Sequence, residues 1–327
     1  MQAITFDGKQ PKFVTNRPHP EPTSGEVVIR PTRLGICSTD LEICRGYMGF
    51  TGVLGHEFVG VVESVAPKAG REVRQWVGKR VVGTINCTCG RCDMCRKGLK
   101  EHCRDRTVLG IAGRDGCFAE QFVLPARNLL EVPEHVDDDQ AVFTEPLAAA
   151  YQIVRQLTVE GRPYITVLGD GRLGLLCAQV LSQLNATVRC LGKHPEKLQL
   201  CEKWGVKHRL VSEVGLRQDQ DIVVDCTASA TGLPMAMQMV RPRGTIVLKT
   251  TVAPQVDGKQ IDLSPLVINE VNVVGSRCGP FPDALAALSA QQIDVVSLIS
   301  RRMRLSDGAD ALRTARRSDV VKVLLEV

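Results

Sequence analysis

The sequence predicts an α/β protein in which a β-rich N-terminal part precedes a doubly wound parallel sheet. Short β-branched runs between turn residues fill roughly the first 145 positions, as in EVVIRPTRLGI and FVGVVESV. After Gly161, apolar runs alternate with segments of helical spacing, beginning with ITVLG and RLGLLCAQVLSQL. This alternation is typical of strands and helices that build a parallel sheet.

The later apolar runs continue the series and set the domain limits. TVRCLG, DIVVDCT, GTIVLKT and VNVVGS lack polar alternation, as strands covered on both faces do. We therefore expect a first domain over residues 1–148 and a parallel-sheet domain over 149–276. The segment 277–327 contains one expected helix, DALAALSAQQ, and a final strand, VVKVLLEV. It is too short to fold alone, so we expect it to return to the first domain.

Composition excludes several classes of function. A chain of 327 residues with 44% hydrophobic content can bury two full cores. Its 41 basic and 36 acidic residues are scattered, which argues against a nucleic-acid partner. No stretch has the roughly 18 to 20 apolar residues that a membrane helix needs, and the N-terminus lacks a signal-peptide pattern. We expect a cytoplasmic protein with no membrane partner.

The 13 cysteines include one dense group, which in a reducing compartment indicates a metal site more than disulfides. Cys89, Cys92, Cys95 and Cys103 follow the pattern C-x2-C-x2-C-x7-C in a lobe near residues 86–105. Four thiolates complete a tetrahedral shell for Zn²⁺ and leave no position for water or substrate. The sequence therefore predicts a structural zinc, with Cys87 left over.

A glycine-rich turn, GDGRLG, follows the first strand of the expected parallel sheet and opens a helix. In a GxGxxG turn the glycines permit a tight bend, close approach of a pyrophosphate and packing of helix on strand. Its place between strand and helix predicts dinucleotide binding. The expected contacts are Gly169, Gly171, Arg172, Leu173 and Gly174.

The next strand bears on the choice of dinucleotide. An enzyme specific for NAD usually has an acidic residue at the tip of this strand, where it binds the ribose 2′-hydroxyl. Here TVRCLG ends at Gly192 without a carboxylate, and Lys193 and His194 could meet a 2′-phosphate. The pattern favours NADP(H) over NAD(H); the alternative is that Lys193 is ordinary surface charge and both cofactors are accepted.

Five motifs occur in order along nearly the whole chain: GICSTD, GHEFVGVV, the four-cysteine lobe, EPLAAA and GDGRLG. In these motifs the sequence resembles the zinc-dependent medium-chain dehydrogenase/reductase superfamily, which includes alcohol and polyol dehydrogenases. The resemblance implies a GroES-like catalytic domain and a Rossmann cofactor domain. It also implies a small-molecule alcohol or carbonyl substrate and a homo-dimer or homo-tetramer.

The same resemblance implies a second, catalytic zinc bound by Cys37 and His56. Many alcohol dehydrogenases have another cysteine at the position of Glu145. The glutamate here resembles the polyol, sugar and threonine dehydrogenase branches instead. Glu57 is a further candidate ligand, because in such branches this glutamate or a water can occupy the position; alternatively, Glu57 orients the site from behind the ligands. Thr39 matches the hydroxyl that takes the proton of the alcohol.

These expectations combine into one function with two alternatives. We expect two zinc ions per chain and hydride transfer between NADP(H) or NAD(H) and an alcohol, polyol, sugar or related carbonyl compound. One alternative is a dehydrogenase-like protein that binds NADP(H) for a sensing or structural role. The other is a reductase of quinones or enones without catalytic zinc.

Overall fold

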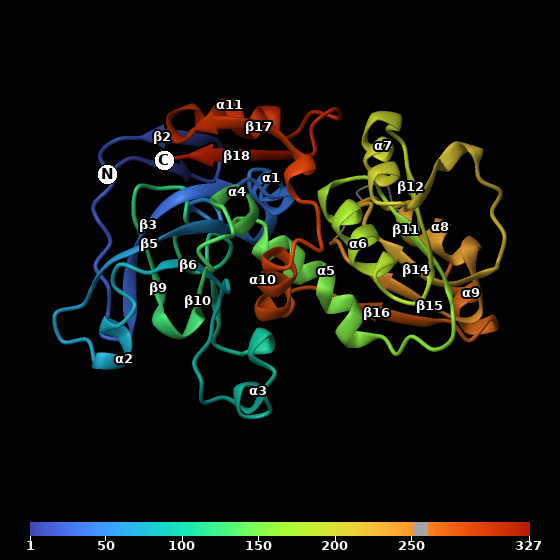
Figure 1. Cartoon of the computed structure of the whole chain (residues 1–327), viewed down its shortest axis with the longest axis horizontal. Coiled ribbons are helices and arrows are strands. Elements are labelled where there is room, and N and C mark those ends of the chain that lie inside the picture. The colour runs from blue at the N-terminus through green and yellow to red at the C-terminus, as the bar shows by residue number, and fades with distance from the viewer. Residues whose placement is uncertain (252–260) are drawn as a thin grey trace. The chain divides into compact units, whose positions relative to one another are not determined.

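The computed structural model describes residues 1–251 and 261–327, and its chain divides into two compact units (Figure 1). The first, here called the β-rich unit, contains residues 1–145 together with 281–327. The second, the parallel-sheet unit, contains residues 146–280. The C-terminal segment thus folds with the N-terminal part of the chain, and both termini lie in the β-rich unit.

A seven-stranded sheet forms the centre of the β-rich unit, in the order β10-β6-β5-β3-β18-β17, with β9 also paired to β3. Its strands are β3 (Glu26–Gly35), β5 (Glu57–Val65), β6 (Arg80–Gly83), β9 (Phe122–Pro125), β10 (Leu129–Glu131), β17 (Ile299–Arg304) and β18 (Lys322–Glu326). Strand β3 is antiparallel to both β5 and β18, and Gly35 lies opposite Glu57 and Leu324. This register brings the start of β5 and the start of β18 together.

Smaller sheets and short helices complete the β-rich unit. A three-stranded sheet has the order β2-β1-β4, and β7 pairs with β8. These strands are β1 (Ala3–Phe6), β2 (Pro11–Val14), β4 (Gly52–Val53), β7 (Asn86–Cys87) and β8 (Thr107–Val108). The helices are α1 (Ser38–Ile43), α2 (Arg71–Arg74), α3 (Asp93–Arg96), α4 (Asp138–Ala141), α10 (Phe281–Ser289) and α11 (Gly308–Thr314). The loop that carries α3 extends from the body of this unit (Figure 1).

Six parallel strands in the order β13-β12-β11-β14-β15-β16 form the second unit, which confirms the predicted doubly wound sheet. They are β11 (Tyr164–Leu168), β12 (Thr187–Gly192), β13 (Lys207–Leu210), β14 (Gln220–Asp225), β15 (Val240–Leu248) and β16 (Asn272–Gly275). The helices are α6 (Arg172–Ser182), α7 (Pro195–Lys203), α8 (Gly232–Met239) and α9 (Ser264–Ile268), while α5 (Thr144–Gln156) begins at the end of the β-rich unit.

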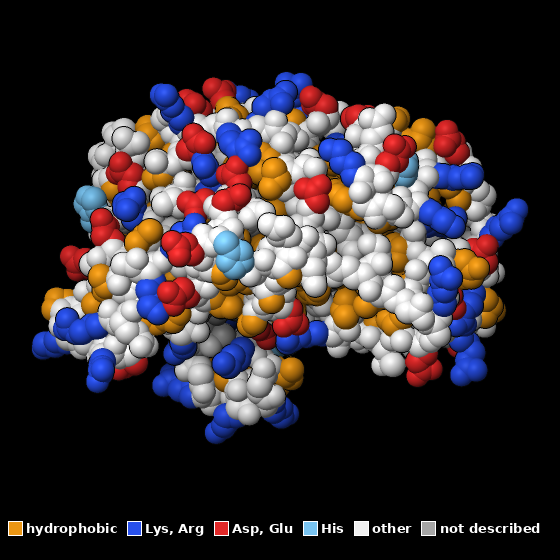
Figure 2. All heavy atoms as spheres, viewed as in Figure 1, with side chains coloured by type: hydrophobic (Ala, Val, Ile, Leu, Met, Phe, Trp, Pro, Cys, Tyr) orange, Lys and Arg blue, Asp and Glu red, His pale blue; other side chains and the backbone are white. Residues whose placement is uncertain are grey.

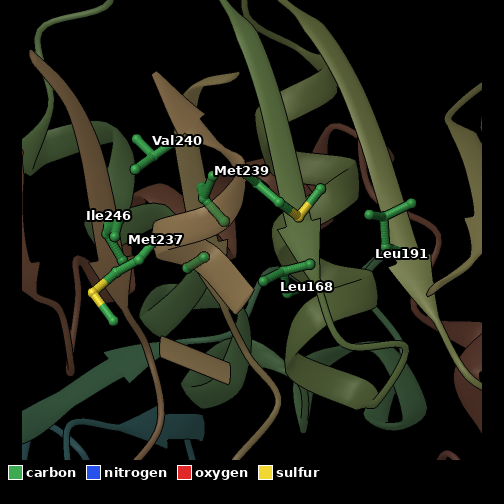
Figure 3. Close-up of a cluster of buried hydrophobic side chains, with 8 residues drawn as sticks. Leu168, Leu191, Met237, Met239, Val240 and Ile246 are labelled. Carbon is green, nitrogen blue, oxygen red and sulfur yellow. The ribbon is translucent and has the colours of Figure 1, made fainter. Parts of the chain in front are cut away.

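The core of the parallel-sheet unit explains its unbroken apolar strands. Ile222, Val223 and Val224 are consecutive and all buried, because both faces of β14 are covered. Figure 3 shows the buried cluster in which side chains of β11, β12 and β15 meet those of α8. Its members are Leu168, Leu191, Val223, Ala236, Met237, Met239, Val240 and Ile246.

The exposed side chains on the face shown in Figure 2 carry charges of both signs. Lys and Arg side chains are interspersed with Asp and Glu over the face shown in Figure 2, without a continuous basic stripe on that face. Within residues 1–251 and 261–327, every helix is too short or too polar to cross a membrane. The sequence did not predict β1, β2, β13, α8 or α11, because each is short or lacks a clean periodic pattern.

Candidate functional site

Cys37 lies at the N-terminus of α1, where the chain leaves β3. It is the N-cap residue of the helix, and its backbone N–H donates to Asp40 Oδ2 at 2.8 Å. The Sγ atom accepts from the backbone N–H of Thr39 at 3.5 Å and lies 3.6 Å from Thr39 Oγ1. The helix start therefore fixes a half-buried thiol with a hydroxyl beside it.

His56 precedes β5 and is only 2% exposed. Its Nδ1 atom lies 3.3 Å from Oδ1 of the fully buried Asp40. Burial alone would lower the pKa of His56, but the neighbouring Asp40 carboxylate and Cys37 raise it well above its usual range. The preceding residue must be glycine, because a Cβ at Gly55 would lie 2.1 Å from the Phe118 ring. Among the described residues neither His56 Nδ1 nor Asp40 Oδ1 has a hydrogen-bond partner, so Asp40 lies behind the ring as an ion-pair neighbour. Carboxylates that orient metal-binding histidines occupy the same position.

Glu57 forms a buried ion pair with Lys322 on β18. Both side chains are 0% exposed, and Lys322 Nζ also donates to the Ile36 carbonyl at 3.2 Å. Lys322 Nζ lies 5.5 Å from the centre of the Phe143 ring. A Cβ at Gly35 would lie 2.2 Å from Glu57 Oε2, so glycine leaves the space that the pair fills. Lys322 therefore compensates the charge of Glu57.

Cys37, His56 and Glu57 form a cluster that could hold a metal ion. One ligand atom from each lies within 4.8 Å of the others. Within the part of the chain that the structure describes, Glu57 Oε1 is a buried atom without a hydrogen-bond partner. A buried carboxylate oxygen of this kind costs free energy unless a cation or a donor meets it. Thiolate, imidazole and carboxylate together are a donor set that suits zinc.

Glu145 is not a member of this cluster. It is a half-buried residue in the first turn of α5 and ends the N-terminal segment of the β-rich unit. The metal-capable groups among the described residues include Glu57 and leave Glu145 out. Its assignment as a zinc ligand stays a prediction.

Cys89, Cys92, Cys95 and Cys103 converge in the loop around α3, again with one ligand atom each within 4.8 Å of the others. The Sγ atom of Cys103 lies 3.5 Å from that of Cys89 and 3.8 Å from that of Cys92. Backbone N–H groups of Arg91 and Cys92 point to Cys89 Sγ. Cys87 is buried outside the cluster, with its Sγ 3.9 Å from the Ile85 carbonyl.

The charges of this lobe favour a bound cation. Backbone N–H groups of Arg104 and Cys95 lower the pKa of Cys92 to about 6. Burial and the neighbouring thiols raise the pKa of Cys95 to about 12. Cys92 and Cys95 therefore do not ionise together at neutral pH without a compensating charge, which Zn²⁺ would supply.

The glycine turn joins β11 to α6 in the parallel-sheet unit. Gly169 has a φ of +109°, and its N–H donates to the Leu191 carbonyl at 2.8 Å. A Cβ at Gly174 would lie 1.9 Å from the Gly169 carbonyl oxygen, whereas a Cβ at Gly171 would meet nothing within 4 Å. The turn is therefore tightly packed at Gly174, where the helix meets the strand. It has free space at Gly171, the side that a pyrophosphate would approach.

Asp170, between the first two glycines, reaches the tip of β12. Its Oδ2 atom accepts from the backbone N–H groups of Lys193 at 2.8 Å and His194 at 2.7 Å. His194 Nδ1 lies 3.1 Å from both carboxylate oxygens. The structure thus brings Gly192, Lys193 and His194 next to the turn, but with a carboxylate among them.

Sequence reasoning missed Lys322 and the contacts of Asp170. A lysine inside the apolar run VVKVLLEV was a signal, because a buried lysine needs an anionic partner. Its partner Glu57 is 265 residues away, so sequence spacing could not identify it.

Two family profiles match the chain. The alcohol dehydrogenase GroES-like domain matches residues 23–134, and the zinc-binding dehydrogenase domain matches residues 173–291. A sorbitol dehydrogenase of Halalkalibacterium halodurans is 27% identical over 332 aligned positions, covering 95% of this chain and 94% of that protein. An L-threonine 3-dehydrogenase of Salmonella arizonae is 26% identical and covers 94% of this chain and 95% of its own length.

Solved structures agree over the whole length. A zinc-binding dehydrogenase from Sinorhizobium meliloti, bound to NADP, superposes with a TM-score of 0.86 at 28% identity, covering 100% of this chain and 99% of that one. An alcohol dehydrogenase from Escherichia coli CFT073, complexed with NADH, gives a TM-score of 0.88 at 27% identity with the same coverage. Fold, motif order and these relatives agree: the chain is an oxidoreductase of the zinc-dependent medium-chain dehydrogenase/reductase superfamily.

Proposed function

We propose that the protein transfers hydride between a nicotinamide dinucleotide and a polyol, a sugar, a hydroxy amino acid or the related carbonyl compound, using one zinc for catalysis. The observation that carries this proposal is the cluster of Cys37, His56 and Glu57 with its unpartnered carboxylate oxygen. The sorbitol and threonine dehydrogenases among the relatives support this substrate range over simple alcohols. Zinc, when bound, supplies a Lewis acid that stabilises negative charge on the substrate oxygen.

Each residue of the cluster then has a distinct task. Cys37 and His56 bind the ion, and Asp40 holds the His56 ring in the orientation needed. Glu57 presents Oε1, while Lys322 balances its charge and keeps Oε2 occupied. Lys322 neutralises the Glu57 carboxylate. Contact with Glu57 therefore lowers the net positive charge of the zinc site less than contact with an uncompensated carboxylate would.

Thr39 is proposed to relay the proton that the alcohol releases, because its hydroxyl would accept that proton while donating its own onward to water. Its hydroxyl lies 3.6 Å from Cys37 Sγ, so it sits beside a proposed zinc ligand. Proton transfer requires a hydroxyl within hydrogen-bond reach of the substrate oxygen, and the place of Thr39 beside this ligand supports its assignment to that role. Glu145 is proposed as an alternative carboxylate ligand of the catalytic zinc. Substituting Glu145 and Glu57 separately with glutamine compares the two candidates.

A second zinc is proposed at Cys89, Cys92, Cys95 and Cys103, with a structural role. The closed set of four thiols leaves no position for substrate. An ion there would tie the ends of the loop around α3 together. The bidentate contact between Arg104 and Asp93, at 2.7 and 2.8 Å, closes the same loop on its outer side.

Self-association into a homo-dimer or homo-tetramer is also proposed. Among the described strands, β16 is an edge strand whose only partner is β15, and Val273 on it is 41% exposed. Val267 and Ile268, on the neighbouring helix α9, are 78% and 77% exposed. Exposed apolar side chains beside an open strand edge are suited to pairing with a second copy.

A substrate panel tests the proposed function. Zinc-loaded protein is assayed with alcohols, polyols, sugars and hydroxy amino acids, and with the matching carbonyl compounds, each with NAD(H) and NADP(H). We expect turnover with a polyol, sugar or hydroxy amino acid, and its loss in Cys37→Ser. Cys44→Ser, at the other end of α1 and outside the metal cluster, is the matched control and should keep the activity. Dinucleotide binding without any turnover would favour a sensing or structural role instead.

A further inference from the structure

The tip of β12 is occupied by a carboxylate that comes from the glycine turn. The Asp170 side chain is 9% exposed, and a Cβ at Gly192 would lie 2.3 Å from Asp170 Oδ2. Strand β12 has no acidic residue at its own end, but Asp170 places a negative charge at that end from the adjacent turn. The absence of an acid from β12 itself therefore does not mean that the tip lacks one.

The same carboxylate occupies the groups that would otherwise bind an anion. Oδ2 accepts from the N–H groups of Lys193 and His194, which lead into α7, and His194 is the N-cap residue of that helix. Backbone N–H groups at a helix start are a common site for phosphate. Here they are already bonded to a buried group of the protein.

The side chains of Lys193 and His194 are poorer phosphate ligands than their sequence indicates. The His194 ring lies 3.1 Å from both oxygens of Asp170, so any positive charge on it is already balanced. Lys193 is exposed, where a single cation is hydrated and screened by salt. A 2′-phosphate, with nearly two negative charges, would have to approach the Asp170 carboxylate to reach either side chain.

From this geometry we propose that Asp170 is a specificity-determining residue that makes NAD(H) the preferred cofactor, in place of the acid that β12 lacks. In a dinucleotide fold the adenosine ribose lies over the tip of the second strand, where a carboxylate accepts from the 2′-hydroxyl and repels a 2′-phosphate. The proposal rests on the proposed dinucleotide binding. The sequence of Gly192, Lys193 and His194 alone favours NADP(H). The position of Asp170 among them reverses that expectation to NAD(H).

The test measures dissociation constants for NADH and NADPH by titrating the zinc-loaded full-length protein and following nicotinamide fluorescence. The wild type should bind NADH more tightly than NADPH by roughly tenfold or more, about 1.4 kcal/mol. Asp170→Asn keeps the shape and an acceptor oxygen but removes the charge, so the ratio of the two constants should shift towards NADPH by roughly tenfold. Asp221→Asn is the charge-matched control, because Asp221 lies at the opposite end of the sheet, on Tyr164 and Arg241.

The wild type also allows a test that does not depend on a variant folding. 5′-AMP should bind more tightly than 2′,5′-ADP, which differs from it by the 2′-phosphate. Equal or tighter binding of NADPH or 2′,5′-ADP by the wild type overturns the inference. The inference is also overturned if Asp170→Asn leaves the ratio of the NADH and NADPH dissociation constants unchanged, or if Asp221→Asn shifts that ratio equally. If neither NADH nor NADPH binds, the proposed function itself fails, and with it the inference that rests on it.

Discussion

Replacing Lys322 with methionine should destabilise the β-rich unit by about 3–5 kcal/mol, the usual cost of removing one partner of a buried ion pair. The substitution preserves most of the side-chain volume but leaves Glu57 charged in a site where both groups are 0% exposed. It also removes the donor to the Ile36 carbonyl. Because the pair has no contact with solvent, screening does not reduce this cost.

The double variant Glu57→Gln/Lys322→Met separates charge from packing. It removes the uncompensated carboxylate and should recover at least about half of the lost stability, with a residual cost from a buried amide of about 1–3 kcal/mol. A double-mutant cycle with the single variants gives the coupling between the two side chains. If the two side chains stabilise the fold only by filling space, the coupling free energy between them should be close to zero.

Unfolding must be followed in the β-rich unit alone, because a chain with two compact units need not unfold in one cooperative step. The chain has two tryptophans, Trp76 in the β-rich unit and Trp204 in the parallel-sheet unit. In a Trp204→Phe background, urea unfolding monitored by Trp76 fluorescence reports on the unit that contains the pair. All variants are compared at equal zinc content. If Lys322→Met unfolds within about 1 kcal/mol of its parent, the assignment of a buried, charge-compensating lysine is refuted.

Three further predictions concern the space, the metals and the pH dependence of these sites. Gly35→Ala should lower the free energy of unfolding by about 2 kcal/mol or more, because its Cβ would lie 2.2 Å from an oxygen of the buried ion pair; Gly25→Ala, with nothing within 4 Å, is the control and should change it little. Cys95→Ser should remove one zinc per chain and lower the melting temperature, as metal analysis and calorimetry would show, and an unchanged zinc content would contradict the four-thiol site. The raised pKa of His56 lets protons compete with zinc from a higher pH, so zinc held by this residue should be released as the pH falls. A titration against pH with a chelating dye measures the release, and zinc retention that does not depend on pH would contradict the role of His56.

Local patterns predicted the parts of the fold that depend on local chemistry. The βα alternation after Gly161, the glycine turn and the close spacing of Cys89, Cys92 and Cys95 are each contained in short stretches of sequence. Strand runs such as DIVVDCT could be recognised because a strand buried on both faces is apolar at every position. The fold class therefore followed from sequence alone, and the parallel sheet confirms it.

Contacts between distant segments could not be predicted in the same way. The partner of Glu57 lies on the last strand, and only the pairing of β18 with β3 brings Lys322 to it. Asp170 was visible inside the glycine motif, but its hydrogen bonds to Lys193 and His194 depend on how the turn packs against β12. Such contacts are set by tertiary structure, which the spacing of residues in one sequence does not encode.

The zinc content of the purified protein tests the central claim most directly. With one ion at each of the two clusters, metal analysis should give two zinc ions per chain. Cys37→Ala should retain one of them with the fold intact, because the cluster of Cys89, Cys92, Cys95 and Cys103 is separate. A native protein with one zinc per chain, whose content Cys37→Ala leaves unchanged, would contradict the assignment of a catalytic zinc to Cys37 and His56.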